Sequence, residues 1–322
     1  MADLRWAAPS RADDEAWLDL LAAVEAVDGR GEAYDHLDVD DEWASVWAHP
    51  ETDSVLVWDG ADLVAFGWLK TQVGEAQAHR IGCWGGVRPS HRGRGIGRRL
   101  LAWQLRRSTE VAAGLGPAEL VVDVLDDQHD LIDLVRRAGF EPVRRFLELV
   151  RPTTAPVPEV PAVGGLAVVP WCGDLEDATR AAHREAFADH WGSEPRGTDA
   201  WRQCYTGHRG FRPDLSLVAL DEATGEVAAF VLCAAYPTDW EAGVPREAWI
   251  NAVGTRRRWR GRGVACRLLG EVLRLVAASG TGFERAILGV DCENPTGALA
   301  LYRGLGFTDL RATTTYRLLL PG

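Results

Sequence analysis

The sequence lacks the features that mark a membrane or secreted protein. No apolar run reaches the roughly 18 residues that a membrane-spanning helix needs. The first residues include the charged Asp3 and Arg5 and contain no apolar stretch typical of a secretory signal. We therefore expect a cytoplasmic protein with no membrane partner.

Metal-binding patterns and the common nucleotide-binding patterns are absent as well. The six cysteines include no Cys-x-x-Cys pair, and none has a histidine at metal-ligand spacing, so we expect free thiols and no metal. Neither Gly-Lys-Ser/Thr nor Gly-x-Gly-x-x-Gly occurs, which excludes the two common phosphate loops. Lysine is nearly absent too, since Lys70 is the only one among 35 basic residues, but no function follows from that.

Basic charge is scarce in the first half of the chain. Residues 1–150 carry 16 basic and 27 acidic side chains, a net charge of −11, whereas residues 151–322 carry 19 and 20, a net charge of −1. An acidic surface repels nucleic acid, so we expect no such partner. The 322 residues, 47% of them hydrophobic, are enough for about two domains with their own cores.

A basic, glycine-rich segment is the clearest feature that the sequence does contain. It runs from Thr255 to Ala265 and precedes an apolar-periodic stretch that continues to Ala277 and predicts a helix. Gly261 and Gly263 allow the backbone to turn so that several N–H groups point one way. Such N–H groups at a helix N-terminus bind anions, so the segment predicts a site for a phosphate or pyrophosphate.

The same pattern occurs a second time, earlier in the chain. Residues 87–97, with Arg92 at the start of an Arg-Gly-Arg-Gly run, again stand between a predicted strand and a predicted helix. Arg92 and Arg260 are 168 residues apart, and Phe140 and Phe307 are 167 apart. A nearly constant offset along the chain indicates an internal duplication.

A proline-rich stretch separates the two copies. It holds Pro152, Pro156, Pro158 and Pro161 and has almost no apolar periodicity, which is typical of an extended linker. We therefore predict a domain at residues 1–150, a linker at 151–165 and a domain at 166–322. In each half the order is strand, helix, three strands, phosphate loop, helix, strand, helix, strand, which favours an α/β fold with a mixed sheet.

The spacing of Arg260, Gly263 and Ala265 resembles the Gln/Arg-x-x-Gly-x-Gly/Ala pattern of the GCN5-related N-acetyltransferases (GNATs). The resemblance covers about all of the chain as two tandem domains. It implies α+β domains with helices on both faces of a mixed sheet, acetyl-CoA as the acyl donor and a small-molecule amine as the acceptor. A monomer or a homodimer is expected.

The resemblance also implies which residues contact the coenzyme. The positions that match the family's strand, pyrophosphate loop and pantetheine-contacting asparagine in the second half are Val253, Gly254, Thr255, Arg260, Gly261, Arg262, Gly263, Val264, Ala265 and Asn294. In the first half the matching loop positions are Val87, Arg92, Gly93, Arg94, Gly95 and Gly97.

Catalytic residues are expected in the second half alone. Tyr302 matches the family's tyrosine near the thioester sulfur, whereas the first half has Val135, which cannot donate a proton. The resemblance thus implies that Tyr302 is the general acid and that residues 1–150 form a degenerate, non-catalytic copy. Glu247 is the candidate general base and Asp291 the alternative.

Two residues and three functions complete the expectations. His190 and Trp191 follow the first helix of the second half, where the family places its acceptor, so they are candidate substrate-binding residues. The favoured function is a small-molecule N-acetyltransferase. The tandem layout is also similar to that of mycothiol synthase, which acetylates the cysteinyl amine of a mycothiol precursor. A coenzyme A-binding regulator without turnover is the third alternative.

Overall fold

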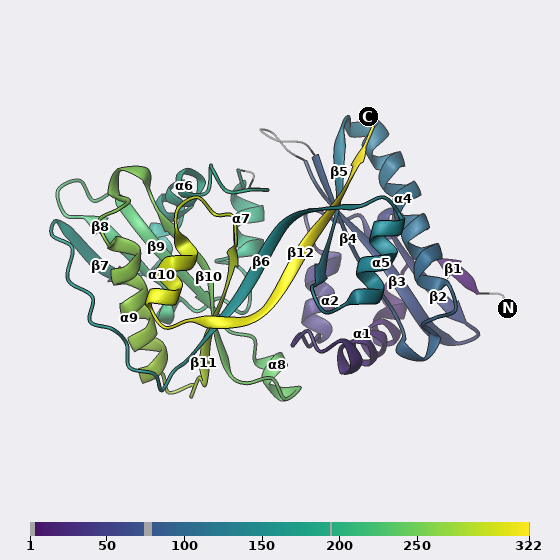
Figure 1. Ribbon diagram of the computed structural model, residues 1–322, viewed down its shortest axis with the longest axis horizontal. Coiled ribbons are helices and arrows are strands. Elements are labelled where there is room, and N and C mark those ends of the chain that lie inside the picture. The colour runs from purple at the N-terminus through teal and green to yellow at the C-terminus, as the bar shows by residue number, and fades with distance from the viewer. Residues whose placement is uncertain (1–3, 74–78, 194, 322) are drawn as a thin grey trace. The chain divides into compact units, whose positions relative to one another are not determined.

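A computed structural model describes residues 4–73, 79–193 and 195–321 (Figure 1). The described chain divides into two compact units. Unit 1 consists of residues 4–144 together with 313–321, and unit 2 consists of residues 145–312. No helix among these residues is long and apolar enough to cross a membrane.

Unit 1 contains the elements of the first half and the end of the last strand. Its helices are α1 (Asp14–Asp28), α2 (His36–Trp43), α3 (Pro50–Asp53), α4 (Ile96–Leu115) and α5 (His129–Arg137), and its strands are β1 (Arg5–Ala7), β2 (Ser54–Asp59), β3 (Asp62–Gln72), β4 (His79–Val87), β5 (Ala118–Leu125) and the end of β12 (Thr308–Leu320). The strand order is β1-β2-β3-β4-β5-β12. Only β4 and β5 pair in parallel among these described strands.

Unit 2 repeats this arrangement. Its helices are α6 (Glu176–Ala186), α7 (Thr198–Cys204), α8 (Pro237–Glu241), α9 (Val264–Ala278) and α10 (Ala298–Gly304), and its strands are β7 (Leu166–Pro170), β8 (Leu217–Asp221), β9 (Val227–Ala234), β10 (Glu247–Thr255), β11 (Arg285–Asp291) and most of β6 (Glu141–Pro152). The order is β7-β8-β9-β10-β11-β6, and β10 and β11 are the parallel pair. The repeated topology agrees with an internal duplication.

The partition of the strands differs from the boundaries predicted from composition. Residue 150 lies inside β6, which pairs with β11 of unit 2, while residues 313–320 of β12 pair with β5 of unit 1. Both strands have 12 or more residues, about twice the usual length. Proline content marks where a chain leaves regular structure, but it carries no information about which sheet a strand joins.

Helices cover each face of the unit 2 sheet and build two cores. On one face α9 buries Leu268, Leu269, Val272 and Val276, as the periodicity predicted, although Leu275 of the same pattern is 37% exposed. On the other face Ala182 of α6 and Trp201 of α7 pack against β8, β9 and β10. The predicted linker is also packed against the first of these cores, because Val160 is buried and its carbonyl accepts a hydrogen bond from Arg267 of α9.

Candidate active site

The parallel strands β10 and β11 separate near their middle. They pair only from Glu247 to Trp249 on β10, so in the described chain the rest of β10, up to Thr255, is paired on its β9 edge alone. In unit 1, β4 and β5 separate in the same way after Gly82. Backbone groups along the open edge can accept an extended ligand as an added strand.

A β-bulge distinguishes β10 from its counterpart β4. Ile250 pairs with Cys233 and Ala252 with Leu232, so Asn251 is the extra residue. The bulge interrupts the alternation of side chains, because Ile250 packs in the core under α9 and Ala252 in the core under α6. The pairing of β4 with β3 is uninterrupted over the described residues. A bulge beside a site re-aims side chains, so this part of the sheet differs between the units.

The glycine-rich loop has the backbone of an anion site. Gly261 and Gly263 adopt φ values of 72° and 80°, in the left-handed region that favours glycine. A Cβ at either position would meet nothing within 4 Å, so the space beside the loop is open. Helix α9 begins at Val264, and its first internal bond runs from the Arg267 N–H to the Gly263 carbonyl. The preceding N–H groups are therefore available to an anion.

Arg260, the arginine of the predicted loop pattern, stabilises the loop through hydrogen bonds to backbone carbonyls. Arg260 donates from Nε to the Thr255 carbonyl at 3.1 Å and from Nη2 to the Ala186 carbonyl at 2.9 Å. In unit 1 the Nε of Arg92 likewise donates to the carbonyl five residues earlier, that of Val87, at 3.0 Å. Arg260 Nη1 also lies 3.7 Å from Asp189 Oδ2, so the guanidinium that we expected to contact the coenzyme is directed at two carbonyls and a carboxylate.

The other arginines of the loops also have defined surroundings. Arg262 lines a cavity of about 420 Å³ together with Trp259 and Asp221, and Arg94 of unit 1 donates to the Ser90 carbonyl at 3.0 Å. Of the remaining predicted loop positions, Gly93 lies in the turn before α4, Gly95 is the N-cap of α4, and Gly97 and Ala265 are the second residues of α4 and α9.

The end of α6 is tied to the start of the loop. Glu185 accepts hydrogen bonds from Arg256 Nε at 2.6 Å and from the Arg257 N–H at 2.9 Å. These bonds lower the pKa of the Glu185 carboxyl although partial burial opposes them. Asp189, just after α6, accepts from Arg257 at 2.7 Å. Segments about 70 residues apart are thereby held together at the C-terminal end of β10.

Tyr302 is buried on α10, the helix that follows β11. Its side chain is 8% exposed and belongs to the core under α9, with its ring 6.2 Å from that of Phe307. Burial raises the pKa of Tyr302 to about 12, so the hydroxyl keeps its proton at neutral pH. No described residue forms a hydrogen bond with that hydroxyl. It is a proton-bearing donor without a protein acceptor.

The equivalent helix of unit 1 has the same cap and different chemistry. The Phe307 N–H donates to the Tyr302 carbonyl at 3.1 Å, and the Phe140 N–H donates to the Val135 carbonyl at 3.1 Å. Val135 is buried in the core of unit 1. Tyr302 and Val135 therefore occupy the same position relative to the C-terminal ends of their helices.

The two candidate bases lie at opposite ends of the separating strands. Glu247 is the first residue of β10, is 4% exposed and forms a buried ion pair with Arg285, the first residue of β11. Asp291 is the last residue of β11, is 3% exposed and accepts a hydrogen bond from the Glu293 N–H at 2.9 Å. Glu247 is thus at the paired end and Asp291 at the open end.

The predicted pantetheine contact, Asn294, is in the turn before α10. Its side-chain oxygen accepts from the N–H and the hydroxyl of Thr296, at 2.9 and 2.6 Å. The oxygen therefore stabilises the turn, and the amide N–H₂ is the part left for a ligand.

The predicted acceptor residues lie among aromatic rings. His190 contacts Phe187, at a ring distance of 5.5 Å, and donates a hydrogen bond from Nδ1 to the Trp191 carbonyl, 3.0 Å away. Trp191 packs on Phe146 at 6.3 Å. Beneath them, His183 is buried and its pKa is lowered to about 3, chiefly by burial and also by Arg196 and His190.

Sequence reasoning missed two polar residues near the bulge. Asn251 Nδ2 donates to the Tyr236 hydroxyl at 3.3 Å, and the Tyr236 ring lies 6.4 Å from that of Trp249. An asparagine inside an otherwise apolar strand was the available signal, because asparagine is depleted in strands and often accompanies an irregularity.

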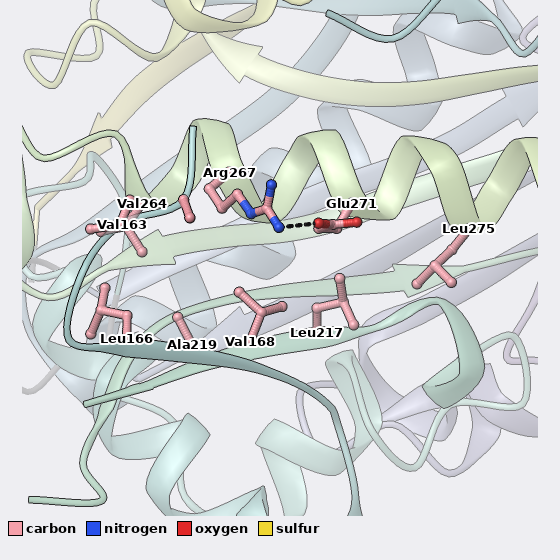
Figure 2. Close-up of a pocket in the computed structure, with 10 residues that line it drawn as sticks. Val163, Leu166, Val168, Leu217, Ala219, Val264, Arg267, Glu271 and Leu275 are labelled. Carbon is pink, nitrogen blue, oxygen red and sulfur yellow. Dashed lines mark ion pairs between the residues drawn. The ribbon is translucent and has the colours of Figure 1, made fainter. Parts of the chain in front are cut away.

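A second cavity lies away from this region. Figure 2 shows it between α9 and the strands β7 and β8, with a volume of about 370 Å³. Leu166, Val168 and Leu217 of the strands lie on one side of it, and Val264, Leu275 and the Arg267–Glu271 ion pair of α9 lie on the other. Val264, a predicted coenzyme-contacting position and the first residue of α9, lines this cavity as well, whereas none of the lining residues comes from β10, β11 or α10. The described residues hold no cluster of His, Cys, Asp or Glu suited to a metal ion.

Comparisons with known proteins agree with this geometry. The sequence profile of the Acetyltransferase (GNAT) family matches residues 15–140 and 176–307. A mycothiol acetyltransferase of Nocardioides sp. is 30% identical over 92% of this chain and 96% of its own. A GCN5-related N-acetyltransferase from Sphaerobacter thermophilus has a similar structure, with a TM-score of 0.76, 25% identity and coverage of 99% and 96%. A tandem GNAT protein from the clavulanic acid biosynthesis pathway shares the fold, with a TM-score of 0.70, 18% identity and coverage of 98% of both chains.

Proposed function

Since this chain belongs to the Acetyltransferase (GNAT) family, we propose that it transfers the acetyl group of acetyl-CoA to a primary amine of a small molecule and that unit 2 performs the chemistry. The observation that carries the second part is Tyr302, a buried, protonated hydroxyl on α10 where unit 1 has Val135. In this proposal the first unit is a non-catalytic copy. Its loop, from Val87 to Gly97, retains the capacity to hold a coenzyme.

The loop of unit 2 fits the diphosphate of the coenzyme. When bound, acetyl-CoA supplies a thioester whose carbonyl carbon the amine attacks. The N–H groups from Gly261 to Ala265 hold the diphosphate, because both glycines keep the backbone turned and the space beside them open. The open edge of β10 from Val253 to Thr255 pairs with the pantetheine arm, and an N–H near Val253 stabilises the oxyanion.

Tyr302 donates a hydrogen bond to the leaving sulfur. Its pKa of about 12 exceeds that of an ordinary thiol by about 3.5 units, which corresponds to about 5 kcal/mol against full transfer of the proton. That is a large cost for a complete transfer, so the tyrosine stabilises the developing thiolate mainly as a hydrogen-bond donor. The hydroxyl therefore stabilises the negative charge that develops on the sulfur while the phenol keeps its proton.

Asp291 is a better base candidate than Glu247. Glu247 is neutralised by Arg285 and lies eight residues before Thr255, about 26 Å along an extended strand. Asp291 is four residues beyond Ile287, the last residue of β11 that pairs with β10, and is on the same face of the strand as Ile287. We propose that Asp291 accepts the amine proton, directly or through water, and that Glu247 stabilises the strand pair.

The acceptor binds on the α6 face of the sheet. His190 and Trp191 line its entrance in this proposal, and Tyr236 and Asn251 supply polar contacts beside the bulge. Aromatic rings with a few hydrogen-bonding groups suit a small organic amine. A screen of amines, with release of free thiol as the readout, tests the activity. Failure of every amine to release thiol while acetyl-CoA still binds would favour the non-catalytic regulator.

A specific acceptor is favoured by one comparison. The relative from Nocardioides sp. is a mycothiol acetyltransferase and aligns over nearly all of both chains. The second candidate is therefore acetylation of the cysteinyl amine of the mycothiol precursor. Turnover of that precursor at a kcat/KM at least 100-fold above that of simple amines would identify it as the substrate, and equal rates would reject it.

A further inference from the structure

Arg151 is a buried cation without an anionic partner. The residue is 2% exposed, near the end of β6, and no described carboxylate pairs with it. Its guanidinium instead donates to four backbone carbonyls, those of Leu305 at 2.8 Å, Pro152 at 3.2 Å, Ala155 at 3.0 Å and Pro156 at 2.8 Å. Burying a charge is costly unless hydrogen bonds compensate, so these contacts determine where the side chain can lie.

One of the four carbonyls belongs to the cap of the helix that carries Tyr302. Leu305 is the C-cap residue of α10, and it follows Tyr302 by three residues. Carbonyls at a helix C-terminus have no donor within the helix, and the helix dipole favours a cation there. Arg151 supplies both the donor and the charge. A helix of seven residues is too short to be stable alone, so its position depends on such contacts.

Unit 1 has an aliphatic side chain at the corresponding place. A Cβ at Gly306, just after α10, would lie 3.5 Å from Arg151 Nε, and a Cβ at Gly139, just after α5, would lie 3.6 Å from Leu318 Cδ1. Both glycines have positive φ and end equivalent helices. The guanidinium is therefore present where the helix carries Tyr302, and leucine is present where it carries Val135.

We propose that Arg151 is a positioning residue for the reaction. It holds the C-terminal end of α10 and thereby fixes the hydroxyl of Tyr302 toward the thioester. This inference rests on the proposed function, because it assumes that Tyr302 acts in turnover. It adds that the segment Pro152–Pro156, bound by the same guanidinium, is part of the support of the catalytic helix.

The test compares Arg151→Leu with Arg274→Leu. Arg274 also donates to this segment's continuation, at the Pro158 carbonyl (3.2 Å), but none of its described contacts involves α10. We expect Arg151→Leu to lower kcat about 10- to 100-fold per folded molecule, since small misplacements of a catalytic group cost rates of that order. The KM for acetyl-CoA should stay within about twofold, because the loop is unchanged. Arg274→Leu should leave both constants within about twofold.

Combination with Tyr302→Phe separates positioning from general destabilisation. If Arg151 acts through the hydroxyl, the double variant Arg151→Leu/Tyr302→Phe should lose no more than Tyr302→Phe alone. Losses that multiply, or a wild-type kcat in Arg151→Leu, would overturn the proposal. Should Arg151→Leu not fold, Arg151→Lys retains the charge and one donor. An intermediate kcat that Tyr302→Phe again masks supports the proposal, and full activity rejects it.

The outcome also distinguishes this inference from the proposed function. Hydrogen exchange of α10, measured by mass spectrometry without any substrate, should be faster in Arg151→Leu than in Arg274→Leu. Unchanged exchange would show that Arg151 does not hold the end of α10, whatever the activity of the variant. Full activity in Tyr302→Phe, together with faster exchange in Arg151→Leu, would instead show that Arg151 holds the end of α10 and that the Tyr302 hydroxyl does not act in turnover.

Discussion

Replacement of Tyr302 by phenylalanine removes one hydroxyl and leaves the ring. The ring packs in the core under α9 and contacts Phe307, while the hydroxyl has no hydrogen-bond partner among the described residues. Removing it breaks no protein hydrogen bond, so the free energy of unfolding should change by less than about 1 kcal/mol. Any large effect of the substitution must therefore come from the reaction.

The expected loss of rate follows from the role of the hydroxyl. Removal of one hydrogen-bond donor that stabilises negative charge in the transition state typically costs about 10²- to 10³-fold in kcat, or about 3 to 4 kcal/mol of barrier. Because Tyr302 is not part of the diphosphate loop, the affinity for acetyl-CoA should stay within about twofold. The decrease should therefore appear in kcat.

The assay measures thiol release, coenzyme affinity by calorimetry and melting temperature on one preparation. Tyr316→Phe is the matched control, since Tyr316 is also buried but lies on β12 in unit 1. A melting temperature that falls while kcat per folded molecule is unchanged would mean that Tyr302 only fills the core. Equal loss of kcat in both variants would also refute the assignment.

Three further predictions test other parts of the site. Gly263→Val, which forces a branched residue to a φ of 80°, should weaken acetyl-CoA binding at least tenfold by calorimetry, whereas Gly95→Val in unit 1 should leave turnover unchanged. Glu247→Gln should lower the melting temperature, because Arg285 loses its buried partner, and spare kcat; a 100-fold lower kcat in folded protein would restore Glu247 as the base. Burial raises the pKa of Tyr302 from 10 to about 12, so denaturant titrations should show its contribution to stability intact below pH 10 and lost between pH 10 and 12, a change absent in Tyr302→Phe.

The elements around the site could be predicted because each depends on local patterns. The apolar periodicity predicted α9, and the glycines predicted the turn before it. The alignment of Tyr302 with Val135 needed only a constant offset between two copies, and both residues occupy the same position relative to a helix cap. Each of these features is a short sequence pattern or a comparison of two such patterns, and neither requires knowledge of which strands pair.

Two features could not be predicted because they depend on which strands pair: the position of β6 in unit 2 and of the end of β12 in unit 1, and the bulge in β10. Nothing in residues 141–152 specifies that β6 joins β11, since pairing depends on a partner more than 130 residues away. At Asn251 the period of two fails by one residue, so a face assignment extended from Glu247 along β10 no longer holds beyond the bulge. The ion pair of Glu247 with Arg285 depends on the pairing of β10 with β11, 38 residues later in the chain, which no local pattern specifies.

The contacts of a single loop residue, Arg260, also could not be predicted from local sequence patterns. Arg260 and Arg262 are both arginines beside a glycine, and residue type alone assigns both to the anion. The structure gives Arg260 an acceptor 74 residues earlier in the chain, the Ala186 carbonyl, which no local pattern specifies. In unit 1 Arg92 Nε donates to the Val87 carbonyl, which is equivalent to the bond from Arg260 Nε to the Thr255 carbonyl. Both copies use this arginine to hold the turn, so the anion site depends on the glycines and N–H groups of the loop. Replacement of Arg260 should therefore weaken anion binding by loosening the loop, and not by removing a direct contact between the guanidinium and the anion.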